Sequence, residues 1–184
     1  MESEALQRMA KNLAGEEPTS KGLRLAAVSV IITERETPQV LLIERAARAG
    51  DPWSGQIAFP GGKTQTEDKT ARDTAVRETF EEVGFDLAVS SRFLGYGEVI
   101  ATHTGTMEVV PVAFELKQPV AVRTNGEVAS FRWVGLHELM APRARSKYVF
   151  NSGGQSVALP AYTVGDYVVW GLTYRILTSL FGAV

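Results

Sequence analysis

The chain has no cysteine among its 184 residues and only two histidines, His103 and His137. Without cysteine it can form no disulfide, no thiolate nucleophile and no cysteine-ligated zinc site. The stretch from Met1 to Ser20 is polar and charged, so it lacks the apolar core of a signal peptide. No apolar run reaches the roughly 18 residues that a membrane-spanning helix needs. These absences predict a cytoplasmic protein with no membrane contact.

The chain also has no large excess of positive or negative charge. The formal net charge is −2 and the isoelectric point is about 5.8. Nucleic-acid binding usually needs a basic surface, so the balance argues against a nucleic-acid partner and leaves room for a local pocket for a small phosphorylated molecule. The chain of 184 residues is long enough for one domain with a sizeable core, and 45% of its residues are hydrophobic.

The apolar pattern predicts an α+β fold, a mixed sheet flanked by helices. Helices are expected over residues 2–13, 69–83, 137–140 and 166–181, with Gly84 ending the second and Asp166 capping the last. Strands are expected over residues 23–32, 40–44, 56–59, 93–101, 107–116 and 127–134. Residues 46–55 and 143–160, the latter with Gly153-Gly154, are expected to be loops.

Three glutamates gather within one predicted helix, in a run that begins with Arg77, fifteen residues after Gly62. At about 100° per residue, Glu78, Glu81 and Glu82 fall on one stripe. Val76, Phe80 and Val83 fall on the opposite, apolar stripe. Glu78 and Glu82 are four residues apart, where like charges repel unless solvent or a cation compensates them. The stripe is either an ordinary solvated face or a set of hard oxygen ligands for Mg²⁺ or Mn²⁺.

The run from Arg77 to Phe85, Arg-Glu-Thr-Phe-Glu-Glu-Val-Gly-Phe, resembles the signature of Nudix hydrolases, G-x5-E-x7-R-E-U-x-E-E-x-G-U with U apolar. There are three departures. Thr79 stands at an apolar position, Asp68 takes the first acidic position, and eight residues rather than seven separate Asp68 from Arg77. The extra residue falls in the loop or first helical turn, so the acidic face is expected to stay intact.

The resemblance implies the αβα sandwich of that family, with a mixed central sheet, a catalytic loop-helix-loop and a C-terminal helix. It places a single hydrolase domain over residues 23–184 and an N-terminal helix and arm over residues 1–22. The implied enzyme is a pyrophosphatase that uses Mg²⁺ or Mn²⁺ to cleave a nucleoside diphosphate linked to another moiety. Nudix proteins are often homodimers, so a dimer is a further expectation.

The resemblance also implies roles for the residues of the motif. Glu78 and Glu82 would ligate the metal, and Glu81 would be a further ligand or the base. Arg77 would contact a substrate phosphate or, as we favour, orient a glutamate through its planar fork. Gly61 and Gly62 either form a plain tight turn or let the backbone approach the substrate pyrophosphate.

Outside the motif, Glu127 is the best candidate for another ligand or the general base, because a glutamate in this region often has that role in the family. The alternative is an exposed loop carboxylate. Glu98 and Glu108 are weaker candidates, and His103 and His137 are expected to be surface residues.

Three further segments resemble the coenzyme A diphosphatase subfamily. They are Leu-Leu-Ile-Glu-Arg-Ala at residues 41–46, Gly-Gln-Ile-Ala-Phe-Pro-Gly-Gly at 55–62, and Val-Val-Trp-Gly-Leu-Thr at 168–173. With the Nudix motif, the resemblance covers about residues 24–181. Arg45 and Arg48 become candidates for binding substrate phosphates, because arginine matches phosphate geometry. Gly50 stands where the subfamily has an arginine, so Arg48 would have to replace that arginine.

The substrate implied is therefore CoA or a CoA derivative. Other Nudix substrates stay open: ADP-ribose, NADH, dinucleoside polyphosphates or oxidised nucleotides. A non-catalytic nucleotide-binding module would need a damaged motif, whereas Arg77, Glu78, Glu81 and Glu82 are all present.

Overall fold

The computed structural model describes residues 4–19, 23–33, 37–51, 53–152 and 155–182. A mixed sheet forms the centre, with the strand order β3-β2-β1-β7-β5. These strands are β1 (Arg24–Thr33), β2 (Gln39–Arg45), β3 (Ile57–Ala58), β5 (Ser91–Tyr96) and β7 (Met107–Leu116). Three short or peripheral strands attach to it: β4 (Gly61–Lys63) to β1, β6 (Ile100–Ala101) to β7, and β8 (Val128–Gly135) to β2. β1 and β7 are parallel over their full length, and the other pairs are antiparallel.

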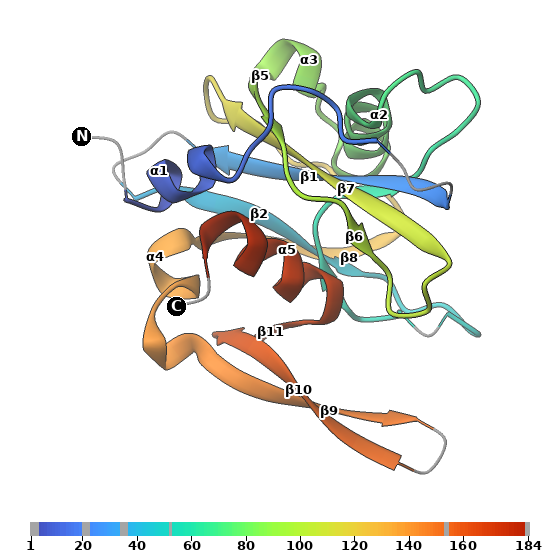
Figure 1. Ribbon diagram of the computed structural model, residues 1–184, viewed down its shortest axis with the longest axis vertical. Helices are drawn as coiled ribbons and strands as arrows, with labels where there is room; N and C mark the ends of the chain where they lie inside the picture. The colour runs from blue at the N-terminus through green and yellow to red at the C-terminus, as the bar shows by residue number, and fades with distance from the viewer. Residues whose placement is uncertain (1–3, 20–22, 34–36, 52, 153–154, 183–184) are drawn as a thin grey trace.

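Helices cover both faces of this sheet, as Figure 1 shows. On one face lie α2 (Ala71–Val83) and α3 (Leu87–Ser90). On the other lie α1 (Glu4–Lys11) and α5 (Gly171–Phe181), while α4 (Leu136–Leu139) and the 3₁₀ turn η1 (Pro142–Ala144) follow β8. The arrangement confirms the α+β class and the αβα layering expected from the sequence. No helix in the described part of the chain is both long and apolar enough to cross a membrane.

The two central strands are apolar almost throughout because both of their faces are covered. Successive side chains of β1 enter different cores. Ala27 and Ile31 pack on the side of α2, whereas Val30 and Ile32 pack on the side of α5. This alternation is the period-two pattern of a strand with two buried faces. It leaves the ends of the strands free to carry polar groups.

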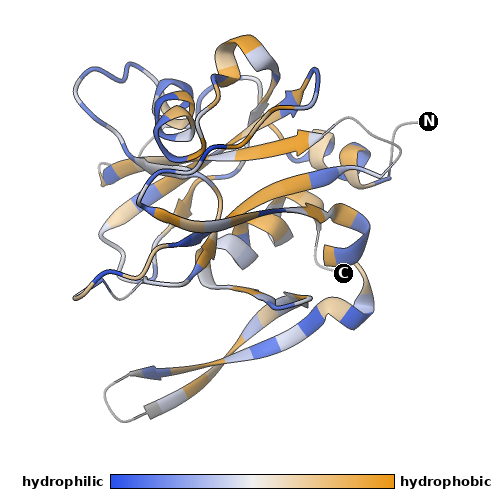
Figure 2. Cartoon of the chain, turned by 180° about the vertical axis from the view of Figure 1, so that it is seen from behind, coloured by the Kyte–Doolittle hydropathy of each residue, from blue (hydrophilic) through white to orange (hydrophobic). Residues whose placement is uncertain are grey.

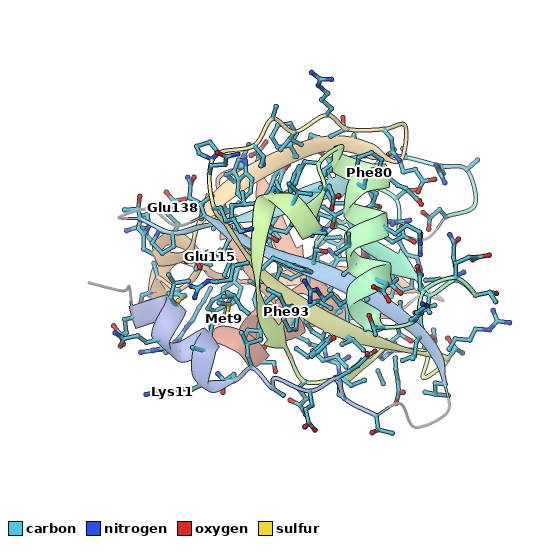
Figure 3. All side chains as sticks on the ribbon, turned by 90° about the horizontal axis from the view of Figure 1, so that it is seen from above. Met9, Lys11, Phe80, Phe93, Glu115 and Glu138 are labelled. Carbon is cyan, nitrogen blue, oxygen red and sulfur yellow. The ribbon has the colours of Figure 1, made fainter. Side chains whose placement is uncertain are left out.

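Helix α1 packs into the core on the α5 side of the central sheet. Ala5 and Met9 pack into the same cluster as Leu180, and the Asn12 side-chain amide donates to the Leu180 carbonyl at 2.9 Å. Figure 3 shows Met9 turned inward from α1 while Lys11 points away. The proposed boundary between an arm over residues 1–22 and a domain over residues 23–184 stays a prediction.

The expected loop over residues 143–160 is wrong. The chain forms a second, antiparallel sheet there, made of β9 (Arg145–Ser152), β10 (Gln155–Val164) and β11 (Tyr167–Trp170). Its β9–β10 pair projects from the body of the molecule, as Figure 2 shows from behind. The glycine pair at residues 153–154 favoured the loop interpretation, although the alternation around Tyr148 and Phe150 is typical of a half-exposed strand. Gly153-Gly154 lie outside the described residues.

The last helix is shorter than expected. Residues 167–170, Tyr-Val-Val-Trp, form β11, and α5 begins only at Gly171. Asp166 does not cap the helix. Its carboxylate instead accepts from the Arg132 guanidinium at 2.6 Å. β-branched and aromatic residues favour the strand, and the glycine with φ of 63° makes the turn into the helix.

Candidate functional site

Helix α2 carries the acidic motif and has well-defined ends. The Thr70 hydroxyl accepts from the Asp73 amide, and the Asp73 carboxylate accepts from the Thr70 amide, which is a capping box. Gly84 ends the helix in the left-handed region, at φ of 80°. These caps confirm the expected end and fix where the motif sits along the sheet.

The buried face of α2 differs from the expected one. Phe80 is 59% exposed, whereas Glu82 is only 3% exposed and Thr79 is fully buried. Figure 3 shows Phe80 on the outside of the helix. The expected apolar stripe is therefore wrong at Phe80, whereas Val83 is buried and Val76 packs against the core. The acidic stripe is split between sheet and solvent. Small residues such as Ala75 let the helix approach the sheet closely.

Thr79, which departs from the Nudix motif, has a partner on β1. Its hydroxyl donates to the Ser29 hydroxyl at 2.7 Å, and Ser29 donates to the Ala75 carbonyl at 3.0 Å. All of these groups are buried. A hydroxyl at an apolar position is stable here because a second hydroxyl across the interface satisfies it.

A double-mutant cycle tests this pairing. Ser29→Ala should destabilise the fold by about 1–3 kcal/mol, because it leaves the Thr79 hydroxyl buried without an acceptor. Thr79→Val should cost about 1 kcal/mol, since Ser29 keeps the Ala75 carbonyl. Urea unfolding should show that the double mutant loses less stability than the sum of the two single-mutant losses. Strict additivity would show that the two hydroxyls are not coupled.

Glu82 points from α2 to the start of β4. Its Oε2 accepts from the Gly61 amide at 2.9 Å. A Cβ atom at the neighbouring Gly62 would lie 2.4 Å from the Glu78 carboxylate, so only glycine lets the two approach. The expected turn at Gly61-Gly62 is thus the short strand β4, whose backbone lies directly against two motif carboxylates.

Burial changes the acidity of both carboxylates. It raises the pKa of Glu82 to about 7, with the nearby charges of Glu78 and Glu127 adding to the rise. The Gly61 amide and the Arg45 charge act in the opposite direction. Burial also raises the pKa of Glu78, against the lowering effect of Arg77. A cation bound beside the two carboxylates would favour their ionised forms and so oppose this rise in pKa.

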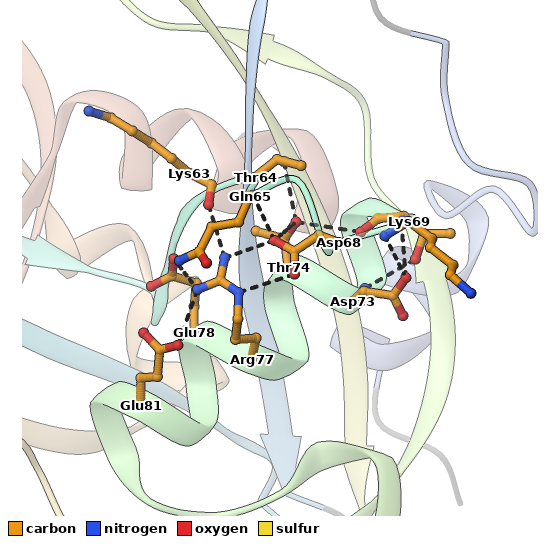
Figure 4. A network of polar contacts seen from close by, with 11 residues as sticks. Lys63, Thr64, Gln65, Asp68, Lys69, Asp73, Thr74, Arg77, Glu78 and Glu81 are labelled. Atoms are coloured by element: carbon orange, nitrogen blue, oxygen red, sulfur yellow. Dashed lines mark hydrogen bonds and ion pairs between the residues drawn. The ribbon is translucent and has the colours of Figure 1, made fainter.

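Arg77 is the centre of a polar network beside this pair (Figure 4). Its Nε and Nη2 bind the two oxygens of Asp68 at 3.1 and 2.8 Å, and its Nη2 also donates to the Lys63 carbonyl at 3.0 Å. Its Nη1 reaches Glu78 at 2.9 Å and Glu81 at 3.3 Å. The bidentate partner of Arg77 is therefore Asp68, which the sequence singled out only as a departure. Its place at the first acidic position was the available signal.

Glu127 lies near this site although it is far away in the sequence. It stands just before β8, and its Oε1 accepts from Arg48 Nη2 at 2.9 Å. Both side chains are about half exposed, at 51% for Glu127 and 52% for Arg48. The charge of Glu127 acts on Glu78 and Glu82, so the structure brings this candidate to the motif.

Arg45, at the end of β2, also lies near the acidic pair, because its charge acts on the pKa of Glu82. Its Nη2 binds Asp51 at 3.2 Å. Its Nε is buried and has no hydrogen-bond partner among the described residues. A buried donor without a partner is costly, so this nitrogen is available for a ligand oxygen.

The remaining candidates differ in their exposure. His103 and His137 are exposed, as expected of surface residues. Glu98 is exposed on the segment after β5, with its Oε2 3.4 Å from the Ser179 hydroxyl. Glu108 is buried on β7, at 4% exposure.

The donor atoms at this site suit a divalent cation. Among the described residues no three His, Asp or Glu side chains gather closely enough to form a metal site by themselves. Mg²⁺, however, usually takes only one or two carboxylates and keeps several waters. Glu82, buried with a raised pKa, and Glu78, whose Oε2 is not held by Arg77, provide two hard oxygen groups. The chemistry of the donors therefore fits Mg²⁺ or Mn²⁺.

Comparison with known proteins gives a consistent result. The family model described as NUDIX domain matches residues 23–150, well over half of the chain. A Nudix hydrolase of Photorhabdus laumondii called NudL is 30% identical over 85% of this chain and 83% of its own length. NudL of Yersinia pestis is 32% identical over 85% of this chain and 78% of its own length. An uncharacterized protein of Schizosaccharomyces pombe is 33% identical over 70% of this chain, and that match spans only 46% of the yeast protein.

Solved structures show the same fold at lower identity. A MutT/nudix family protein from Enterococcus faecalis superposes with a TM-score of 0.55 at 17% identity, over 98% of this chain and 73% of that one. The Ap4A hydrolase of Caenorhabditis elegans gives a TM-score of 0.52 at 19% identity, over 61% of this chain and 80% of that one. At these identities the likeness concerns the fold alone.

Proposed function

The chain belongs to the Nudix hydrolase family, and we propose that within this family it hydrolyses the pyrophosphate bond of coenzyme A or a CoA derivative. Pyrophosphatase chemistry on nucleoside diphosphate derivatives and dependence on a divalent metal ion follow from the family. The choice of CoA and of Mg²⁺ or Mn²⁺ is the proposal. It is supported by the CoA diphosphatase-like segments around residues 41–46, 55–62 and 168–173.

One structural observation carries the substrate proposal furthest. Arg45, which belongs to the first of these segments, has a buried Nε without a partner among the described residues and lies near Glu82. A guanidinium there can donate to a phosphate oxygen of the substrate. Arg48, now paired with Glu127, is the second candidate for a phosphate, including the 3′-phosphate of CoA.

In the proposed reaction Glu78 and Glu82 would hold the divalent ion. The ion, when bound, polarises the phosphoryl oxygens, helps to activate water and neutralises charge on the leaving group. A carboxylate takes a proton from the attacking water, which forms a new bond to one phosphorus while the bridging P–O bond breaks. The products are adenosine 3′,5′-bisphosphate and 4′-phosphopantetheine.

Two residues can act as that base. Glu81 is half exposed beside the buried pair, and Glu127 is held near it by Arg48. Arg77 is assigned a positioning role, because it holds Glu78 and Glu81 and its fork is occupied by Asp68. The homodimer and the cytoplasmic location stay predictions from the family and the sequence.

A comparison of substrates tests the proposal. Purified protein is incubated with CoA, ADP-ribose and NADH, each with Mg²⁺ or Mn²⁺, and the products are separated by chromatography. We expect adenosine 3′,5′-bisphosphate from CoA to appear faster than AMP from the other two. Faster release of AMP from ADP-ribose or NADH would keep the Nudix chemistry and reject CoA as the substrate.

A further inference from the structure

A cavity whose lining includes none of the motif glutamates lies beside the end of β2. It has a volume of about 290 Å³ and opens between the segment from Ser54 to Ile57 and the second sheet. This volume is at the lower end for ligand sites, so it suits one flat group rather than a whole dinucleotide. None of the roles proposed for the acidic motif uses this cavity.

One wall of the cavity is aromatic. Tyr148 and Trp170 stack with their ring centroids 4.1 Å apart and an interplanar angle of 11°, and Phe150 lies 5.5 Å from Trp170. Tyr148 and Phe150 are two residues apart on β9, so they share one face of the second sheet. Trp170 belongs to β11, beyond the residues 23–150 that match the family model. Part of this wall is therefore specific to the C-terminal segment of this chain.

The facing wall offers hydrogen-bond acceptors. The Oε2 of Glu44 accepts from the Ser130 hydroxyl at 2.8 Å, and Ser130 in turn lies 2.8 Å from the Tyr167 hydroxyl. Within the described residues no hydrogen bond reaches the Oε1 of Glu44. Asp166 also lines the cavity, and its charge is paired with Arg132.

The cavity lining does not favour a phosphate, although Arg132 contacts two of its residues, Asp166 and Tyr167. The lining includes the carboxylates of Glu44 and Asp166, and no arginine or lysine belongs to it among the described residues. An aromatic wall facing an acceptor is instead complementary to a flat heteroaromatic ring that carries an amino group. Stacking supplies most of the attraction, and the amino group gives a donor for the carboxylate.

The cavity and the acidic motif meet at the end of β2. Glu44 and Arg45 are consecutive residues at the end of β2, where a register shift interrupts the pairing with β8. Glu44 lines the cavity, whereas the charge of Arg45 acts on Glu82. From Ile57 at the cavity to Gly61 at the motif the chain can span at most about 14 Å. One substrate can therefore place its pyrophosphate at one site and another of its groups at the other.

We propose that this cavity binds the adenine base of the substrate, which stacks on the Tyr148–Trp170 wall and donates its amino group to Glu44. The inference rests on one part of the proposed function, namely that the substrate is a nucleoside diphosphate derivative. CoA, ADP-ribose and NADH all contain an adenine nucleotide, so the inference does not depend on which of them is cleaved. It assigns base recognition to residues outside the Nudix motif. The rest of the substrate extends past the edge of the sheet to the glutamates.

Binding of adenosine 5′-monophosphate tests the aromatic wall without any turnover. Titration calorimetry on the full chain should show that Tyr148→Ala weakens AMP binding about tenfold or more, the effect of losing one stacking partner. Val149→Ala is the matched control, because Val149 is 56% exposed on the other face of β9. It should bind AMP like the wild type. Equal affinity of Tyr148→Ala and the wild type would overturn the proposal.

A base exchange tests the acceptor. Glu44→Gln keeps an acceptor for Ser130 and adds an amide donor, so it should reverse the preference between AMP and inosine 5′-monophosphate. The wild type should prefer AMP about tenfold, since the carboxylate repels the carbonyl of hypoxanthine. No difference between the two nucleotides, in either protein, would overturn the assignment. So would a loss in Tyr148→Ala of affinity for 4′-phosphopantetheine but not for AMP.

The two proposals fail in different ways. If CoA is not hydrolysed while AMP binding responds to Tyr148→Ala and Glu44→Gln, the substrate proposal fails and the base site stands. If CoA is hydrolysed and both variants bind AMP and inosine 5′-monophosphate like the wild type, the base site fails and the substrate proposal stands.

Discussion

Glu82→Gln is expected to lower the hydrolysis rate about a thousandfold or more, because it removes the charge that helps to hold the divalent ion against the substrate. The glutamine keeps the size of the side chain and an oxygen to accept from the Gly61 amide. Steady-state rates on CoA, or on whichever substrate is cleaved fastest, measure the effect. Near-wild-type turnover would remove Glu82 from the metal site.

The same substitution should stabilise the metal-free protein at alkaline pH. Burial raises the pKa of Glu82 to about 7 from its ordinary value of 4.5. Its contribution to stability is therefore complete below pH 4.5 and is lost as the pH rises through 7. At pH 8 in EDTA, Glu82→Gln should be more stable by about 1–3 kcal/mol, and the gain should vanish near pH 4.

Metal should reverse this order. With millimolar Mg²⁺ or Mn²⁺ the wild type gains stability from binding, whereas Glu82→Gln gains much less. The matched control is Glu67→Gln, the same change at an exposed residue in the loop before α2. It should behave like the wild type in rate, in EDTA and with metal. An equal metal-induced rise in melting temperature for wild type and Glu82→Gln would contradict the account.

Arg77→Ala should cost about 3–5 kcal/mol of folding stability, because it leaves buried carboxylates without their counter-charge. The side chain of Asp68 is 5% exposed and that of Glu78 is 14% exposed, and both bind Arg77. Arg77→Lys should lose part of this stability, since an ammonium cannot form the two-oxygen pair with Asp68. Urea unfolding at pH 7 measures both losses. Arg72→Ala, an exposed arginine of the same helix over the Phe93 ring, should cost less than about 1 kcal/mol.

Acid should weaken the Arg77 cluster in a defined range. Hydrogen bonding to Arg77 lowers the pKa of Asp68 to about 2 from its ordinary value of 3.8. The stability that Asp68 provides is present above pH 3.8 and is lost as the pH falls through 2, about 2 kcal/mol in total. The penalty of Arg77→Ala should therefore shrink between pH 4 and pH 2. A penalty that does not change over this range would show that Asp68 is not the main partner.

The kinetics of Arg77 variants separate positioning from substrate contact. If Arg77 acts by holding Glu78, Arg77→Lys should lower kcat and weaken metal binding while KM for the substrate changes little. A rise in KM with unchanged kcat would instead indicate that Arg77 binds a substrate phosphate.

The sequence predicted those helices and strands whose own residues, such as apolar runs and capping residues, match the structure that they form. β1, β2 and β7 are largely apolar runs of strand length, β8 alternates between apolar and polar residues, and α2 has a capping box and a terminal glycine. The motif also gave the acidic residues that surround Gly61 and Gly62. These features depend on residues that are close in sequence, so a single chain reveals them.

Other features depended on distant partners and were missed. The helical angles put Phe80 in the core, but the real contact face follows Thr79, which pairs with Ser29, and Glu82, which binds β4. The sequence did not predict the second sheet, because its strands mix apolar and polar residues. The pairing of β9, β10 and β11 depends on contacts between strands, which a local pattern does not contain. The aromatic wall of the cavity beside Glu44 was therefore not predicted either.

The most direct test of the central claim is a calorimetric titration of Mn²⁺ into metal-free wild type, Glu82→Gln and Glu67→Gln. The account predicts that wild type and Glu67→Gln bind Mn²⁺ alike and that Glu82→Gln binds it at least about tenfold more weakly. Equal Mn²⁺ affinity in all three proteins would contradict the claim that the buried glutamates of α2 hold the catalytic metal.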